Sequence, residues 1–283
     1  MQWKSTLSLL ALWSSASLLA QVVNIEQARV NADSTGWQAN LDLSYFRQEF
    51  DDDLTTLTGR FSAQKKDSKV YLLFLADAGY SYSQEDVFTN YKLAHVRASV
   101  KVATKARWEG FVQIQDNRPL GIQFRSLVGT GPRLRLLVKD NGRLYGGTTA
   151  MLENEWATSG VKDQWVLRSS NYLNFNWSKD NKFGLASTLY YQPRFSNLID
   201  YRVSGQHSLI YAFTKKLNGK LEFTHYFDSQ PPSEGLNRSR ITTLGLSYVL
   251  EWSASSAGLM SLRGTMLLHW VIRTTSSPVP IMW

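Results

Sequence analysis

Hydrophobic and polar residues alternate with a period of two along most of the chain. In the segment WQANLDLSY, Trp37, Leu41 and Tyr45 fall on one face of an extended chain, and Gln38 and Asn40 fall on the other. A period of two is typical of a β-strand with one apolar face. The alternation predicts twelve strands, at residues 37–45, 57–63, 70–80, 94–100, 108–114, 122–136, 144–152, 173–177, 183–191, 203–213, 221–227 and 244–252.

The segments between these strands consist of turn residues. Examples are KKDSK at 65–69, KVATK at 101–105 and SKDNK at 178–182. Such clusters separate the strands of hairpins. No helical pattern long enough for a crossover intervenes, so we predict that neighbouring strands run antiparallel. The fold class is therefore all-β, with a single antiparallel sheet.

The segment VGTGPRLRLL at 128–137 combines glycines, a proline and arginines, and it has two interpretations. A phosphate-binding loop needs a lysine after its second glycine and then a helix, and both are missing here. Alternation instead continues through the segment, with Ile122, Phe124, Val128, Leu134 and Leu136 on one face. We therefore predict a strand kink in which Pro132 removes one ladder bond. The residues of the kink are Gly129, Gly131 and Pro132.

Two architectures accommodate such strands. A soluble barrel packs its apolar face inward, whereas an outer-membrane barrel turns that face to lipid. Most strands reach about ten residues, which suffices to cross a bilayer when tilted. The other face is rich in charged and polar residues, which a dry core does not tolerate. We predict a transmembrane β-barrel of about twelve strands, and the alternative is a soluble exported β-barrel that binds a small ligand. Aromatic residues near the strand ends resemble interfacial girdles: Trp37, Tyr45, Tyr80, Tyr82, Phe88, Trp108, Tyr191, Tyr211, Phe213, Phe227 and Trp252.

The chain divides into three parts. Residues 1–20 are predicted to be a signal peptide, with Lys4 before a short apolar run and cleavage after Ala20 favoured over Ala16. Residues 21–252 are the predicted barrel. Residues 253–283 contain no acidic residue and no alternation, so we expect a tail outside the barrel. A shifted reading frame would give the same kind of sequence.

Charge and cysteine content exclude several kinds of function. The net charge is +8 for the whole chain, and without Lys4, Arg263 and Arg273 it is 28 − 23 = +5 for residues 21–252. The basic residues are scattered, so we expect no nucleic-acid partner. The absence of cysteine excludes disulfides and thiolate metal sites. We predict no cofactor and no bound metal, and the oligomeric state does not follow from the sequence.

Charged residues on the polar face are the candidate functional residues. An arginine-lined constriction selects anions, so a passive channel for small anionic solutes is one interpretation. An interior network of ion pairs with only a structural role in the envelope is the other. Outer-membrane lipid is the expected partner of the apolar face in both. The predicted lumen-lining residues are Arg60, Arg97, Arg125, Arg133, Arg135, Arg143, Arg168 and Arg202 with Asp42, Asp77, Glu109, Glu153 and Glu222.

A barrel hydrolase of the lipase or protease type is an alternative function. It needs Ser and His, or Asp and His, brought together at a rim or on the outer face. His95 is on the polar face, His207 and His225 are among apolar residues, and His269 is in the tail. Pairing of His225 with Asp228 is poor because three-residue spacing puts them on opposite faces of a strand. The prediction is therefore a protein that is not an enzyme, without catalytic residues.

Four segments also resemble a known family. They are VNIEQARVNADSTGWQANLDLSY, WEGFVQIQDN, LVGTGPRLRLL and RLYGGTTAMLENE. The chain resembles, over about residues 22–252, a bacterial outer-membrane β-barrel family of unknown function, a DUF family whose members are described as salt-induced outer-membrane proteins. The resemblance implies an outer-membrane barrel in a Gram-negative envelope and transfers no catalytic residue. Members of such a family are expected to end with their last strand, here LGLSYVLEW, so residues 253–283 depart from the pattern.

Overall fold

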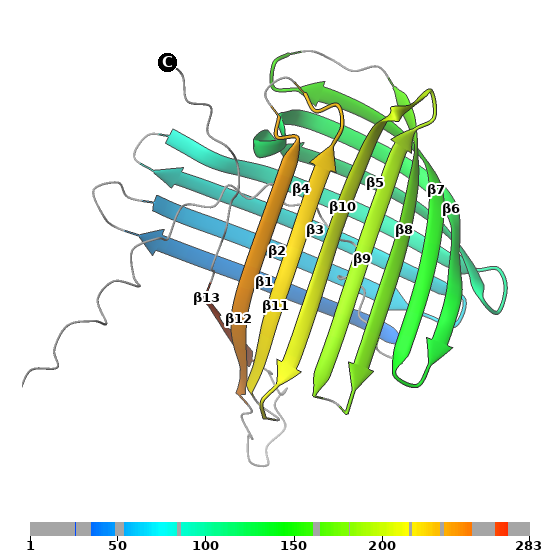
Figure 1. Cartoon of the computed structure of the whole chain (residues 1–283), viewed down its shortest axis with the longest axis vertical. Helices are drawn as coiled ribbons and strands as arrows, with labels where there is room; N and C mark the ends of the chain where they lie inside the picture. Colours follow the sequence, from blue (N-terminus) through cyan, green and yellow to red (C-terminus); the bar gives the residue numbers. More distant parts are fainter. Residues whose placement is uncertain are drawn as a thin grey trace, which may run out of the picture.

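A computed structural model describes residue 26 and residues 35–48, 54–83, 86–160, 165–180, 182–214, 217–232, 235–250 and 264–270 (Figure 1). All of its long elements are strands, which confirms the predicted fold class. They are β1 (Gly36–Gln48), β2 (Leu54–Lys66), β3 (Val70–Ser83), β4 (Asp86–Lys101), β5 (Ala106–Asn117), β6 (Ile122–Lys139), β7 (Gly142–Ala157), β8 (Val166–Lys179), β9 (Phe183–Arg194), β10 (Asn197–Ala212), β11 (Leu217–Asp228), β12 (Arg238–Leu250) and β13 (Gly264–Trp270), with a single 3-10 turn, η1 (Arg118–Leu120).

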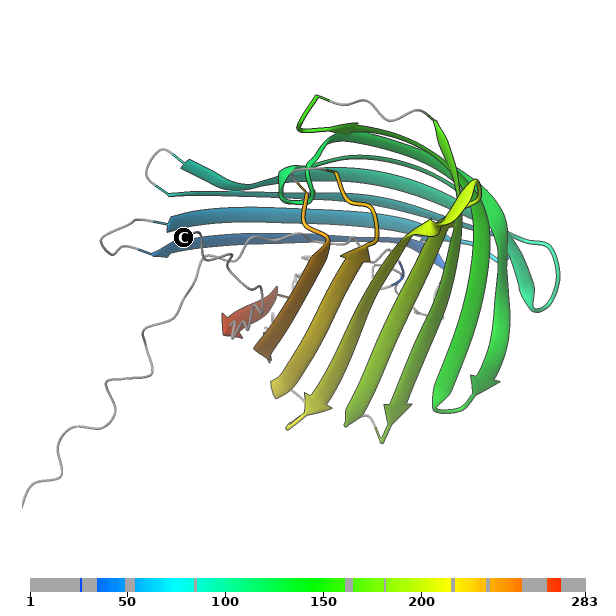
Figure 2. The ribbon, with the colours of Figure 1, turned by 45° about the horizontal axis from the view of Figure 1, so that its top comes forward.

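The strands form one antiparallel sheet in strict sequence order. Each strand pairs with the next through a hairpin, as the turn residues predict, and the sheet curls around a common interior (Figure 2). Within the described residues, β1 pairs only with β2 and β13 only with β12, so these two strands are the edges of the curled sheet. No helix in the described part of the chain is long and apolar enough to span a membrane.

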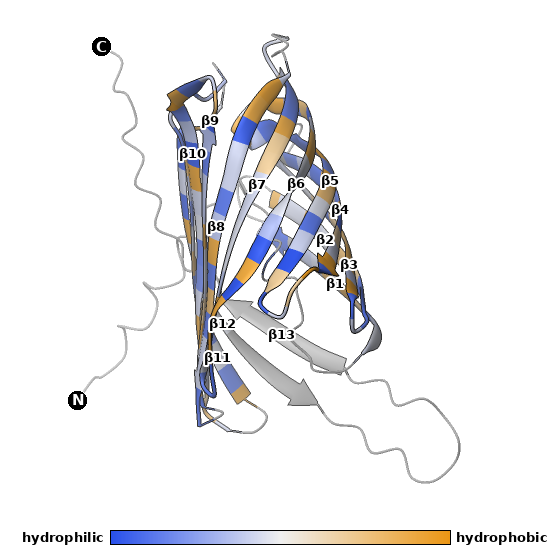
Figure 3. Ribbon diagram, turned by 90° about the vertical axis from the view of Figure 1, so that its right-hand side faces the viewer, coloured by the Kyte–Doolittle hydropathy of each residue, from blue (hydrophilic) through white to orange (hydrophobic). Residues whose placement is uncertain are grey.

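Side chains alternate between the two faces of the sheet, as β3 shows. Leu73, Leu75 and Asp77 are buried, whereas Leu72 and Phe74 between them are exposed. Hydrophobic and hydrophilic residues likewise alternate along the other described strands (Figure 3). The exposed large residues are mostly apolar, and many buried ones are charged. A soluble protein has the opposite distribution, so the fold is a membrane barrel with its apolar face toward lipid. The soluble alternative is wrong for this reason.

The predicted aromatic residues are mainly on the outward face. Large exposed fractions are found for Trp37, Tyr45, Tyr80, Tyr82, Trp108, Tyr191 and Phe213. The side chains of Phe88 and Trp252 lie outside the described residues, as do residues 1–20 with the predicted signal peptide. The outward placement of Phe88 and Trp252 and the signal peptide at 1–20 therefore stay predictions.

The glycine-rich segment lies within the single long strand β6. Its register with β7 runs from Thr130 paired with Ala150 to Arg133 paired with Gly147, and no pair is formed in between. A Cβ atom on Gly131 would lie 2.1 Å from the carbonyl oxygen of Thr148 in β7, so only glycine permits this close approach. The segment is therefore part of a strand, and no helix follows as a phosphate-binding loop requires. A kink at Gly129, Gly131 and Pro132 stays a prediction.

The alternation along β6 was predicted wrongly at Ile122. Its side chain is buried and contacts Leu120 and Tyr226 in the interior, whereas Phe124 is exposed. The reason is an irregularity between Ile122 and Phe124, where the register with β7 shifts by one residue. A bulge adds one residue and exchanges the two faces of a strand. The predicted phase holds from Phe124 to Leu134, and a second irregularity follows between Arg135 and Leu137.

The number of strands also differs from the twelve expected. The structure adds β13, whose seven residues pair with β12 from Leu244 to Leu250. It comes from the predicted tail, where no alternation marks a strand. Residues 251–263 and 271–283 lie outside the described residues, so the assignment of 253–283 to a separate tail stays a prediction.

Candidate functional site

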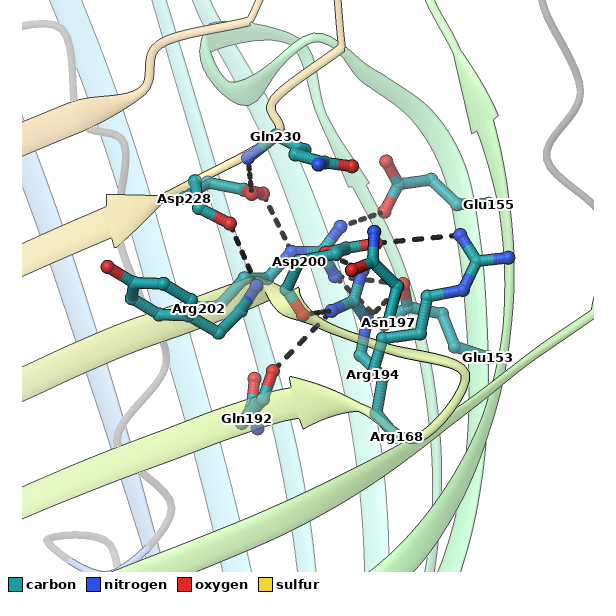
Figure 4. A network of polar contacts seen from close by, with 12 residues as sticks. Glu153, Glu155, Arg168, Gln192, Arg194, Asn197, Asp200, Arg202, Asp228 and Gln230 are labelled. Atoms are coloured by element: carbon teal, nitrogen blue, oxygen red, sulfur yellow. Dashed lines mark hydrogen bonds and ion pairs between the residues drawn. The ribbon is translucent and has the colours of Figure 1, made fainter.

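The interior contains two clusters of ion-paired side chains that come from different strands. The first, which we call the Arg202 cluster, is shown in Figure 4 together with its polar neighbours. Strand alternation points its residues inward, and the curl of the sheet brings the distant strands β7 and β10 within contact. Its members are Arg125 of β6, Glu153 and Glu155 of β7, Arg168 of β8, Arg194 of β9, Asp200 and Arg202 of β10 and Asp228 of β11.

Arg202 is the centre of this cluster. Its Nη1 donates to both carboxylate oxygens of Glu153, at 2.8 and 2.9 Å. Its Nη2 donates to Glu155 at 3.2 Å and its Nε to Asp228 at 2.7 Å. Hydrogen bonds between charged groups are stronger than neutral ones, and arginine supplies five donors in a fixed plane. One guanidinium group therefore ties together strands β7, β10 and β11.

Three further arginines complete the network, and one of them, Arg194, lies 3.5 Å from Asp200. Arg125 donates through Nε to Glu155 at 2.6 Å and also forms an ion pair with it through Nη2. Arg168 contacts Asp200 at 2.8 Å and Glu153 at 3.4 Å. The four arginines of the cluster thus face four carboxylates. Their charges balance within the wall of the barrel.

The second cluster, the Arg133 cluster, consists of Arg97 in β4, Glu109 in β5, Arg133 in β6, Tyr172 in β8 and Glu26 from before the first strand. Arg97 Nη1 donates to Glu109 at 3.0 Å. Arg133 Nη1 donates to the Tyr172 hydroxyl at 2.9 Å and to the Glu26 carboxylate at 2.5 Å. Tyr172 in turn donates to Glu109 at 3.1 Å. The hydroxyl and the two arginines therefore link the four strands β4, β5, β6 and β8 and the N-terminal segment.

A cavity of about 90 Å³ separates the two clusters. Its lining includes Arg97 of one cluster and Arg125, Glu153 and Arg202 of the other, together with apolar and aromatic residues. Because a water molecule takes about 30 Å³ of liquid volume, this space holds only a few waters or one small solute. The interior is therefore narrow and charged.

Loops approach each other over one end of the interior. The segment between β11 and β12 passes η1 of the β5–β6 connection so closely that a Cβ on Gly235 would lie 2.5 Å from the carbonyl oxygen of Leu120. Leu120 is buried beside Tyr226 of β11. At the same end, the backbone N–H of Asp228 donates to the Asn237 carbonyl at 2.9 Å. The described residues of this connection, 229–232 and 235–237, therefore contact the β5–β6 connection at this end of the interior.

The predicted lumen-lining residues fall into three groups. Arg97, Arg125, Arg133, Arg168, Arg202, Glu109 and Glu153 lie in the two clusters. Arg60 pairs with the buried Asp77 at 2.6 Å away from them, and Glu222 accepts from Ser208 at 3.0 Å. Arg135 is exposed and Arg143 is half-buried, while the Asp42 side chain lies outside the described residues. Lining of an open lumen stays a prediction for all of them.

Several interior residues were missed by the sequence analysis. Glu155 comes two residues after Glu153 in β7 and therefore lies on the same face of the strand. The alternation alone could have identified it. Asp228 stands opposite Arg202 in the hairpin register of β10 and β11, which the turn at 213–216 defines. Glu26 gave no signal, because it precedes the strands and its place in the interior depends on tertiary structure. Tyr172 was not singled out because a tyrosine within a strand is common.

The histidines have different environments. His95 lies in the interior, where its Nε2 accepts from Arg97 Nε at 3.3 Å. His207 and His225 lie on the outward face together with exposed apolar residues such as Leu209 and Phe223. The two histidine rings stack with their centroids 5.3 Å apart. The Ser187 hydroxyl lies 2.8 Å from His207 Nδ1, a pairing that the sequence analysis did not consider. No group of three or more metal-binding side chains occurs among the described residues.

A family model matches residues 27–250. The chain belongs to the DUF481 family, described as proteins of unknown function. The match confirms the resemblance found in the sequence. No curated protein matches this DUF481 protein.

Solved structures with a similar arrangement of strands are porins. The NanC porin has 10% identity and a TM-score of 0.43, over 75% of this chain and 100% of its own. The KdgM porin in complex with disordered oligogalacturonate has 12% identity and a TM-score of 0.39, over 73% and 97%. OccK11 (OpdR) of Pseudomonas aeruginosa has 9% identity and a TM-score of 0.37, over 84% and 91%. These values are too low for us to infer the function of the DUF481 protein from them.

Proposed function

We propose that this protein is a passive outer-membrane channel for small anions, with a narrow arginine-rich lumen. The observation that carries the proposal is the placement of Arg97, Arg125 and Arg202 around one interior cavity of about 90 Å³. The Arg202 cluster is neutral as a whole, but the lining of the cavity itself contains these three arginines and one carboxylate, Glu153. Positive charge in a poorly hydrated passage attracts anions strongly, because the surroundings screen it less than bulk water does. The size of the cavity restricts the solutes to inorganic anions and small carboxylates.

The test is the reversal potential of the purified protein in a planar bilayer under a salt gradient. We expect a small conductance with anion preference. Arg125 lines the cavity, so Arg125→Gln should reduce that preference. The matched control is Arg238→Gln, which removes the same charge from an exposed residue beside the outward-facing Phe227 and should leave selectivity unchanged.

The absence of any conductance would overturn the channel proposal. The ion pairs would then have only a structural role, and the protein would be a filled barrel of the envelope. Equal selectivity in the wild type and in Arg125→Gln would also contradict an arginine-lined passage. Folding of each variant is checked independently by heat-modifiable mobility on gels.

The Ser187–His207 pair favours a second candidate function, hydrolysis of lipid esters at the outward face. In that reaction Ser187 Oγ would attack the ester carbonyl while His207 takes its proton, and the alcohol would leave after receiving that proton. Water, deprotonated by His207, would then attack the acyl-serine, which releases the fatty acid and returns the proton to Ser187 Oγ. Among the described residues, no carboxylate orients His207. Ser187 also lies within strand β9, where backbone N–H groups form hydrogen bonds to neighbouring strands. Its own N–H is therefore not available to stabilise an oxyanion.

Release of fatty acid from phospholipid in mixed micelles tests this candidate. Ser187→Ala should abolish the release, and Ser169→Ala, which removes a second outward-facing hydroxyl on the neighbouring strand β8, should not. No release by the wild type, or equal release by wild type and Ser187→Ala, would exclude it.

A further inference from the structure

Glu26 is an interior residue that comes from the segment before the sheet. It precedes β1, yet its side chain is only 1% exposed and lies between two arginines of the barrel wall. Its Oε2 accepts from Arg133 Nη1 at 2.5 Å, and its Oε1 is 3.8 Å from Arg97 Nη1. A carboxylate of the chain itself therefore occupies a position inside the barrel that strands alone do not fill.

The wall holds the groups around Glu26 in fixed orientations. The Arg97 guanidinium lies over the Phe111 ring at 4.8 Å, and the Arg133 guanidinium lies over the Tyr145 ring at 4.4 Å. Stacking on aromatic rings orients a guanidinium while leaving its N–H groups free to bind anions. The Tyr172 hydroxyl adds a polar contact to Arg133 at 2.9 Å. These groups form a site that is complete without the N-terminal segment.

Charge distinguishes this site from the Arg202 cluster. In the Arg202 cluster the strands supply both the arginines and an equal number of carboxylates. In the Arg133 cluster they supply two arginines, Arg97 and Arg133, but only one carboxylate, Glu109. Glu26 brings the second negative charge. Because a buried charge is favourable only beside opposite charge, the position between Arg97 and Arg133 favours a carboxylate.

We propose that Arg97, Arg133 and Tyr172 form a binding site for a carboxylate, and that Glu26 is its built-in ligand. A small carboxylate such as formate or acetate takes the same position when Glu26 is absent or withdrawn. Glu26 then competes with the solute for this position. The role in transport rests on the proposed channel, whereas the binding of carboxylate does not.

The first test is rescue of Glu26→Ala by added carboxylate. The thermal midpoint of the purified variant in detergent is compared in sodium acetate and in sodium chloride, at equal pH and ionic strength. We expect a lower midpoint than the wild type in chloride and a recovery in acetate. The wild type should show no difference between the salts. The matched control is Glu222→Ala, because Glu222 is half-buried and paired with the exposed Lys220, so its removal leaves a hydrated space.

Equal midpoints of Glu26→Ala in the two salts would overturn the proposal. A second measurement covers the case in which this variant does not assemble. The chain has no cysteine, so Glu26→Cys carries a single thiol for modification in the assembled barrel. An anionic methanethiosulfonate should react about tenfold faster than a cationic one, a ratio that corresponds to about 1.4 kcal/mol. Equal rates would contradict the presence of an anion site.

Conductance separates this inference from the proposed function. If the channel exists, Glu26→Gln should have a larger anion conductance than the wild type. If no variant conducts but acetate rescues Glu26→Ala, the channel is excluded while the carboxylate site stands. If the wild type conducts anions but neither acetate nor thiol labelling shows preference for an anion, the channel stands and the site is excluded.

Discussion

Replacement of Arg202 should be among the most destabilising single changes in the barrel. Arg202→Met removes hydrogen bonds to Glu153, Glu155 and Asp228 at once. Glu153 and Glu155 keep contacts with Arg125. Asp228 keeps two neutral donors, the Tyr226 hydroxyl at 3.1 Å and the Gln230 N–H at 3.0 Å.

The expected loss follows from the removal of one partner of a buried ion pair, which costs about 3–5 kcal/mol. A loss of about 3 kcal/mol lowers the folding equilibrium constant roughly 100-fold. Arg202→Lys should lose less, although one ammonium group does not replace a planar group with three separate contacts. Combining Arg202→Met with Asp228→Asn should recover part of the loss, because the carboxylate left without its arginine is then neutralised.

Urea unfolding of the barrel reconstituted in lipid vesicles, followed by tryptophan fluorescence, measures these differences. The control is Arg118→Met, because Arg118 is half exposed and pairs with Asp116 at 3.4 Å. An exposed pair contributes at most about 1 kcal/mol. A loss below about 1 kcal/mol for Arg202→Met, or equal losses for the two variants, would refute the idea that the buried network holds the strands together.

Three further outcomes are expected. Gly131→Ala should destabilise the barrel by about 1–3 kcal/mol through overpacking against β7, whereas Gly110→Ala, whose Cβ would have its nearest neighbour at 3.9 Å, should be tolerated in the same unfolding assay. An epitope tag in the 229–237 connection should be accessible on intact cells and one at 102–105 only after the outer membrane is breached; the reverse result would invert the topology. Deletion of 253–283 should leave heat-modifiable assembly intact, and failure to assemble would show that β13 belongs to the barrel.

The candidate site was predictable only in part. Arg97, Arg125, Arg133, Arg168 and Arg202 were singled out because they alternate with apolar residues, and all are buried in the interior. The partners of these arginines were predictable only where a hairpin register defines them. The pairing of Arg202 with Asp228 follows from a local hairpin register, but its contact with Glu153 joins β7 and β10, which are not neighbours in the sheet.

The sequence by itself determined the strands and the face on which most side chains lie, because a period of two is a local property of an extended chain. Tertiary structure decided the rest. It set the shift at Ile122, since a bulge changes the register without a mark in the pattern. It also decided which charges meet across the interior, because the curl of the sheet brings separate strands together. Glu26 has no periodic context at all, and its position between Arg97 and Arg133 is visible only in the folded structure.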